Sequence, residues 1–234
     1  MGPSCLKQSL LNSSFSYGSF FSGMGTAEAA VERAATLARA HSLNAKARLA
    51  FACDFDKGCQ ALLMHTCKDH GACLIGDVMQ TMNARARHCA TTGACFTTRL
   101  AKAMAVPEQG QRRVQCLSHQ QLCTLQAEDM LVGGSPCVDF SKAGLLKGLE
   151  GPSSPTLIAW IRRARQAKIA VHENVDGCPD TPFFALSVTH HKWKFLVETS
   201  DTGFGRIVTR KRVYRIFIRK DCKLVLLLQS FLLC

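Results

Sequence analysis

Short apolar runs alternate with helical stretches in the first third of the chain, and this alternation constrains the fold more than any other feature. The apolar runs predict strands at Phe15–Phe21, Arg48–Cys53 and Ala72–Ile75. Between them, Ala27–Ala40 and Asp56–Cys67 have helical patterns. Strands separated by helices form βαβ units, which build a mostly parallel sheet. We therefore expect an α/β fold.

The second half continues the pattern and then changes it. Two further strands and two helices are predicted at Asp129–Val132, Lys168–Val171, Thr156–Lys168 and Phe183–Val188. Lys192–Glu198 and Arg212–Arg219 then read as two strands whose connection holds Gly203 and Gly205, which predicts an antiparallel hairpin. The glycine- and proline-rich segment Gly144–Pro155 is expected to be a flexible loop, and residues 79–126 receive no assignment.

Length and composition predict one domain over residues 15–221, with tails at 1–14 and 222–234. The net charge of +12 favours anionic partners, of which nucleic acid is the commonest. Thirteen cysteines without a signal peptide pattern indicate a reducing compartment, where most would be small buried hydrophobes. No run of about 18 apolar residues occurs, so no membrane partner is expected.

Two glycines lie between the first predicted strand and its helix, in Phe21-Ser22-Gly23-Met24-Gly25. Glycine lets a backbone approach a ligand without a Cβ clash, which is typical of nucleotide-type cofactor loops. Asp54, at the end of the next strand, is placed to accept hydrogen bonds from a ribose diol, with Phe55 beside it for an adenine. An N-cap carboxylate and a core phenylalanine are the structural alternative.

A cysteine follows the strand at Asp129–Val132, in Gly133-Gly134-Ser135-Pro136-Cys137-Val138. A carboxylate, Glu173, ends the next strand in His172-Glu173-Asn174-Val175. Loops at the carboxyl ends of neighbouring strands face one crevice in an open α/β sheet. This spacing predicts a nucleophile and an acid in the same pocket, whereas the alternative is one more buried cysteine.

These segments, in this order, resemble the cytosine-5 DNA methyltransferases, and the Gly-Gly-Ser-Pro-Cys start is most similar to the de novo-type enzymes of eukaryotes. The resemblance implies a Rossmann-like methyltransferase fold, with a mostly parallel sheet ending in an antiparallel hairpin. It also implies S-adenosylmethionine as cofactor, because Asp54-Phe55-Asp56 and Gly76-Asp77-Val78 resemble the family's ribose and adenine elements. The cofactor residues carried over are Phe21, Ser22, Gly23, Met24, Gly25, Asp54, Phe55, Asp77, Val78 and Pro136.

The same resemblance implies the chemistry. Cys137 would attack C6 of a flipped-out cytosine, and Glu173 would hydrogen-bond the exocyclic amine and N3 of the ring. Arg210 and Arg212 match the two arginines of a family element that helps to fix the flipped base. Two positions depart from the family: Val208 replaces a glutamine of that element, and Val138 stands at a polar position.

The resemblance covers about Phe20 to Asp221 and includes neither the family's target-recognition region nor its carboxyl-terminal motif. We therefore expect weak cofactor binding and base recognition that depends on another chain or is lost. Three functions stay open: a DNA methyltransferase, an RNA cytosine methyltransferase, and a silent homologue that binds nucleic acid or another methyltransferase chain. The expected location is the nucleus, with the cytoplasm as the alternative.

No metal site is predicted. Cys67, His70 and Cys73, with Cys59 upstream, offer a possible zinc motif, but three ligands within seven residues would strain one tetrahedron. His190-His191 has no partner pattern and is expected in a surface turn.

Overall fold

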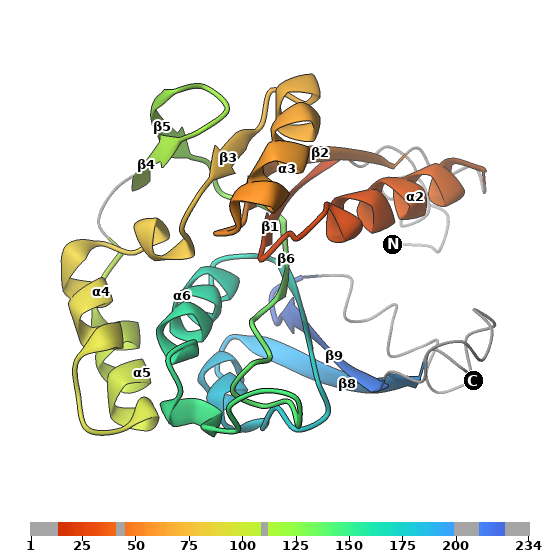
Figure 1. Cartoon of the computed structure of the whole chain (residues 1–234). Helices are drawn as coiled ribbons and strands as arrows, with labels where there is room; N and C mark the ends of the chain where they lie inside the picture. Colours follow the sequence, from red (N-terminus) through yellow and green to blue (C-terminus); the bar gives the residue numbers. More distant parts are fainter. Residues whose placement is uncertain (1–13, 41–44, 109–111, 199–210, 223–234) are drawn as a thin grey trace.

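A nine-stranded sheet runs through the computed structural model, which describes residues 14–40, 45–108, 112–198 and 211–222. The order of the described strands is β5-β4-β3-β2-β1-β6-β7-β9-β8 (Figure 1). Their bounds are β1 Ser14–Phe20, β2 Lys46–Cys53, β3 Cys73–Ile75, β4 Arg112–Cys116, β5 Gln121–Leu125, β6 Met130–Gly134, β7 Ile169–Asn174, β8 His190–Glu198 and β9 Lys211–Arg219.

The five central strands are parallel, and an antiparallel hairpin extends each edge. β1 lies in the middle, between β2 and β6. The strands β2 and β3 are added on one side of it, and β6 and β7 are added on the other. That reversal is the switch point at which open α/β sheets bind ligands, beyond the carboxyl ends of the strands. The predicted parallel sheet and its terminal hairpin are confirmed. The second hairpin, β4–β5, lies in the segment that the sequence left unassigned.

Helices cover both faces of the sheet (Figure 1). The helix bounds are α2 Thr26–Ala40, α3 Lys57–Asp69, α4 Ala84–Thr91, α5 Phe96–Ala105 and α6 Ser154–Ala164, with 3-10 turns η1 Val78–Thr81, η2 Gly148–Glu150 and η3 Thr181–Leu186. Alternate residues of the strands serve two cores, as the pleat requires. In β2, Phe51 packs towards α4, α5 and α6, and Ala52 towards α2 and α3.

Several local predictions need correction. The stretch predicted as a helix near Phe183–Val188 is the 3-10 turn η3, and the Thr156–Lys168 helix begins two residues earlier, at Ser154, and ends at Ala164. His190 is not in a surface turn but begins β8, where it is buried and its Nε2 lies 3.0 Å from the Ala167 carbonyl. Ser14 belongs to β1, while the rest of the predicted amino-terminal tail and residues 223–234 lie outside the described residues.

Candidate active site

The loop that carries Cys137 is held at both of its ends. At its start, the Asn174 side chain donates from Nδ2 to the carbonyl and to Oγ of Ser135, at 3.0 and 2.9 Å. The carbonyl of Cys137 itself accepts from the N–H groups of Phe140 and Ser141. Cys137 is half-buried and is a free thiol. The strand end and the turn together therefore fix the position of this thiol.

A buried aspartate, Asp139, closes the same loop and was missed by the sequence reading. Its Oδ2 accepts from the backbone N–H of Ser153 at 3.0 Å. Gly151 packs so tightly on it that a Cβ there would lie 2.0 Å from the Asp139 Cγ. The segment predicted as a flexible loop, Gly144–Pro155, is thus anchored to Asp139 and already contains η2 and the start of α6.

Glu173 lies directly beside the last residue of β6. In the parallel register Gly134 pairs with Glu173, and a Cβ on Gly134 would lie 2.7 Å from Oε2 of the carboxylate. Arg212, from β9, places its Nε 2.6 Å from Oε1 of Glu173. Two of the predicted catalytic residues are therefore in direct contact, while Arg210 lies outside the described residues.

His172 supports the site from inside the sheet. It is fully buried, its Nε2 lies 2.9 Å from Oγ of Ser135, and its ring packs edge-on against Trp160. Burial, and then the nearby Arg215, lower the pKa of His172 to about 3, so the ring is neutral at physiological pH. The sequence gives one indication of this burial. His172 immediately precedes Glu173 on the same strand, and neighbouring residues of a strand face opposite sides of the sheet.

The glycine loop after β1 adopts the backbone that its sequence predicts. Gly23 and Gly25 have φ values of +57° and +88°, a region that side chains disfavour. The Gly23 N–H donates to Oδ2 of Asp54 at 2.7 Å, and the Cys53 N–H donates to Oγ of Ser22. The loop is thereby tied to the end of β2.

Six of the predicted cofactor residues line one cavity of about 210 Å³, which is mostly apolar with two acids at its wall. They are Phe21, Asp54, Phe55, Asp77, Val78 and Pro136. Asp77 caps η1 by accepting from the Met79 N–H, and Asp54 accepts from Gly23, yet a carboxylate oxygen can accept a second hydrogen bond. Acids and an aromatic ring around a small cavity suit a nucleoside.

The remaining predicted residues lie elsewhere. Ser22, Gly23 and Met24 line a groove of about 880 Å³ on the α2 face, together with Glu173, and Phe21 lies between the groove and the smaller cavity. Gly25 and Cys137 line neither. The predicted residues that line a cavity thus fall into two groups, and only Phe21 belongs to both.

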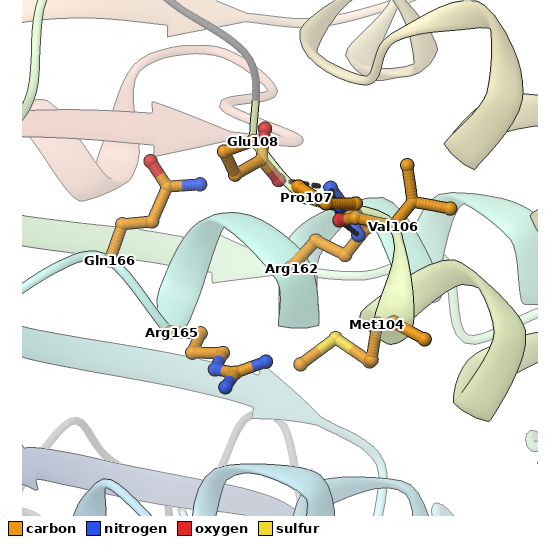
Figure 2. Close-up of a pocket in the computed structure, with 8 residues that line it drawn as sticks. Met104, Val106, Pro107, Glu108, Arg162, Arg165 and Gln166 are labelled. Carbon is orange, nitrogen blue, oxygen red and sulfur yellow. Dashed lines mark hydrogen bonds and ion pairs between the residues drawn. The ribbon is translucent and has the colours of Figure 1, made fainter.

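Another cavity, of about 400 Å³, lies between the end of α5 and α6 (Figure 2). Arg162 closes one side of it by donating to the Val106 carbonyl and by an ion pair with Glu108. None of the predicted site residues lines this cavity. Arg162 already has protein partners, and the cavity, which Arg165 also lines, is separate from the candidate site.

Comparisons of the sequence with known proteins find similarity to methyltransferases. Residues 108–182 match the family model described as C-5 cytosine-specific DNA methylase. Two phage proteins, orphan methyltransferase M.Rho11sI of Bacillus phage rho11s and M.SPRI of Bacillus phage SPR, are each 31% identical over 102 residues. The matched part is 40% of this chain but only 20% and 23% of the phage proteins.

The fold has a solved counterpart in the Entamoeba histolytica methyltransferase EhMeth. That structure aligns with a TM-score of 0.54 at 12% identity, over 91% of this chain and 55% of the other. At this identity the likeness concerns the fold alone, and it confirms the predicted Rossmann-like architecture. Among the described helices, none is long and apolar enough to cross a membrane.

Proposed function

We propose that this chain, a relative of the C-5 cytosine-specific DNA methylases by its match over residues 108–182, transfers a methyl group to C5 of cytosine in DNA. One observation carries the proposal. Glu173 is held between Gly134 and Arg212 at the same sheet edge at which the Cys137 loop begins. A thiol and an oriented carboxyl at adjacent strand ends are the two groups that this reaction needs.

S-adenosylmethionine is the proposed methyl donor, because the residues around the smaller cavity fit it. Asp54 can accept from the ribose, Asp77 from the adenine edge, and the exposed ring of Phe55 can lie against the base. When bound, the cofactor supplies an electrophilic methyl group. Pro136 also lines this cavity. Cys137 is the next residue along the chain, so the proposed nucleophile is adjacent in sequence to a residue of the cavity wall.

Cys137 would supply the covalent step. Its thiolate forms a bond from Sγ to C6 of cytosine, and the electron pair of the C5–C6 double bond makes C5 nucleophilic. C5 would then take the methyl group, with S-adenosylhomocysteine as the leaving group, after which the C5 proton would leave to water, the C6–S bond would break and the thiolate would be restored. Because C6 is shielded in a stacked duplex, the base must first leave the helix, at a cost of roughly a few kcal/mol.

Glu173 and Arg212 would hold the base during this addition. The carboxyl group accepts from the exocyclic amine and, when protonated, donates to N3, which draws electron density from the ring. Arg212 fixes the position of that carboxyl through its 2.6 Å contact. The net charge of +12 favours a polyanionic substrate. We propose DNA as the substrate in place of RNA because the matching family model is a DNA methylase.

The test is covalent trapping on duplex DNA that contains 5-fluorocytosine, with S-adenosylmethionine present. Fluorine at C5 cannot leave as a proton, so a reacting enzyme stays attached through its thiol. We expect a denaturant-resistant adduct that needs both the cofactor and Cys137, and that disappears in Cys137→Ala.

Cys95→Ala is the matched control. Cys95 lies outside the candidate site, and hydrogen bonds from Thr97 and Thr98 lower the pKa of its thiol to about 7, so it tests whether a second thiolate contributes to the adduct. An adduct that survives Cys137→Ala, or that is lost in Cys95→Ala, would refute the assignment of Cys137. A folded protein that forms the adduct with fluorinated RNA and not with DNA would refute the proposed substrate. A folded protein that forms neither would indicate a silent homologue.

A further inference from the structure

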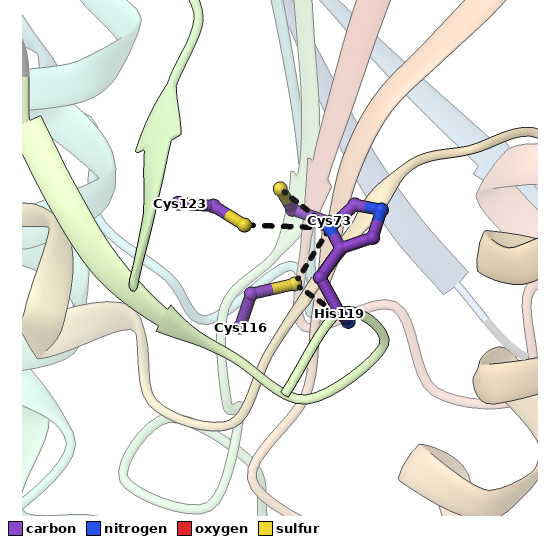
Figure 3. A group of neighbouring side chains, drawn as sticks. All are labelled: Cys73, Cys116, His119 and Cys123. Carbon is purple, nitrogen blue, oxygen red and sulfur yellow. Dashed lines mark hydrogen bonds between the residues drawn. The ribbon is translucent and has the colours of Figure 1, made fainter. Parts of the chain in front are cut away.

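We propose that Cys73, Cys116, His119 and Cys123 bind one structural zinc ion. Each residue offers one ligand atom, and the four atoms all lie within 4.8 Å of one another (Figure 3). The proposed zinc site does not depend on the proposed methyl transfer. Three thiolates and one imidazole form a complete tetrahedral set, with no position left for a water or a substrate, which is the pattern of structural zinc sites.

The distances match a tetrahedron built on zinc. Nδ1 of His119 lies 3.3 Å from Sγ of Cys116, 3.4 Å from Sγ of Cys123 and 3.7 Å from Sγ of Cys73. With Zn–S near 2.3 Å and Zn–N near 2.0–2.1 Å, the nitrogen–sulfur edge of a tetrahedron is about 3.5 Å. The three measured edges lie on either side of this value.

Hydrogen bonding alone does not explain the cluster. One ring nitrogen either donates one proton or accepts at one lone pair, so it can serve one of the three sulfurs and not all of them. A cation at the centre satisfies all four atoms at once. Thiolate-rich sites select zinc over magnesium or calcium, which prefer oxygen ligands.

The four ligands come from two parts of the chain that meet only in the folded protein. Cys73 is the first residue of β3, while the other three belong to the β4–β5 hairpin and its turn. The spacing Cys116-x-x-His119-x-x-x-Cys123 is the sequence signal that was overlooked. Of the zinc motif considered from the sequence, Cys73 alone belongs to the cluster, and His70 instead is the C-cap residue of α3.

The proposed zinc would fasten the hairpin to the sheet. In the ladder, β4 pairs with β3 through one residue pair, Ile75 with Cys116, and three hydrogen bonds link the turn to the same segment: Ser118 Oγ donates to the Ala72 carbonyl and accepts from the Leu74 N–H, and the Leu117 N–H donates to the Leu74 carbonyl. The turn also packs near Asp77 of the cofactor cavity, since Leu117 lies 3.4 Å from where a Cβ on Gly76 would be. A metal ion bound here would hold the hairpin turn against Gly76, the residue that precedes Asp77.

The test is metal analysis of the full chain, expressed with zinc and purified under reducing conditions without chelator. We expect about one zinc per chain by mass spectrometry, and little in His119→Ala or Cys123→Ser. Because the His119 side chain is exposed, His119→Ala should fold even if a cysteine variant does not, and circular dichroism checks this. Cys59→Ser removes a half-buried cysteine outside the cluster and should keep the zinc.

Cobalt gives a second readout that needs no activity. Co²⁺ added to the chelator-stripped protein should show the visible bands of a tetrahedral thiolate site, and these bands should be absent in His119→Ala. Folded wild-type protein that holds no zinc and gives no such bands would overturn the proposal. So would equal zinc content in wild type and His119→Ala, or a disulfide within the cluster in the reduced preparation.

Discussion

Nε of Arg212 lies 2.6 Å from Oε1 of Glu173. This contact joins β9 to the carboxyl end of β7, next to the strand end at which the Cys137 loop begins. The Arg212 side chain is only 14% exposed and that of Glu173 33%, so the contact is partly shielded from water. Arginine offers a rigid set of donors that lysine does not reproduce. The pair therefore fixes the position of the carboxyl and does more than balance its charge.

We expect Arg212→Gln to slow methyl transfer by about 10²-fold, because a small misplacement of a catalytic group has an effect of this order. Single-turnover transfer of a labelled methyl group measures the rate, and cofactor binding should change little because Arg212 lines neither cavity. Arg212→Lys should recover only part of the rate. An unchanged rate in both variants would exclude this role for Arg212.

Gly134→Ala should disturb the same carboxyl from the other side. The new Cβ would lie 2.7 Å from Oε2 of Glu173, so the carboxyl has to move. We expect a destabilisation of about 1–3 kcal/mol and a loss of transfer rate. Gly71→Ala is the control, since Gly71 has a φ of +60° with open space around it, and should destabilise without changing the rate. Thermal melting and the transfer assay separate the two effects.

The Asp180–Arg215 pair should make the protein sensitive to acid. Although partial burial would raise it, the hydrogen bond and charge of Arg215, at 2.7 Å, hold the pKa of Asp180 below its usual range. A depressed carboxyl pKa stabilises the fold above the unfolded value of about 3.9, and this contribution is lost as pH falls through the folded pKa.

Urea unfolding between pH 7 and pH 3 measures this dependence, and Asp180→Asn should make the acid part of the curve shallower. The variant should also be less stable at pH 7, because Arg215 is fully buried and loses its charged partner. Asp69→Asn, which removes an exposed carboxylate from α3, should leave the curve as it is. Parallel curves for wild type and Asp180→Asn would contradict the prediction.

Cys95 should be alkylated at a lower pH than Cys59. Hydrogen bonds from Thr97 and Thr98 lower the pKa of Cys95 to about 7, whereas desolvation and the nearby Asp54 raise that of Cys59. Since the thiolate is the reactive form, reaction of Cys95 with iodoacetamide should be half-maximal near pH 7. Peptide mapping at several pH values distinguishes the two, and equal pH profiles would refute the prediction.

Some parts of the site follow from sequence because local pattern and chain order are enough. The alternation of apolar runs and helices gives the parallel sheet, and carboxyl ends of neighbouring parallel strands meet at one edge. This is why Cys137 and Glu173, read from their places after two strands, belong to the same edge. The glycine loop and Asp54, which the sequence places after consecutive strands, lie together through the hydrogen bond from Gly23.

Other contacts join residues whose meeting no sequence pattern predicts. Asp139 and His172 are buried, and they contact Gly151 and Trp160, which belong to other segments of the fold. Residues 79–126 show weak periodicity, so the β4–β5 hairpin was not assigned.

By itself, the sequence determined the α/β class and the strands after which the candidate site residues lie, because these follow from hydrophobic period and chain order. Only the tertiary structure decided which edge of the sheet the β4–β5 hairpin joins, and with it the meeting of Cys73 with Cys116, His119 and Cys123. The physical reason is that the approach of Cys73 to the hairpin depends on long-range packing, which is selected by the free energy of the whole fold and is not encoded in the local spacing of Cys116, His119 and Cys123.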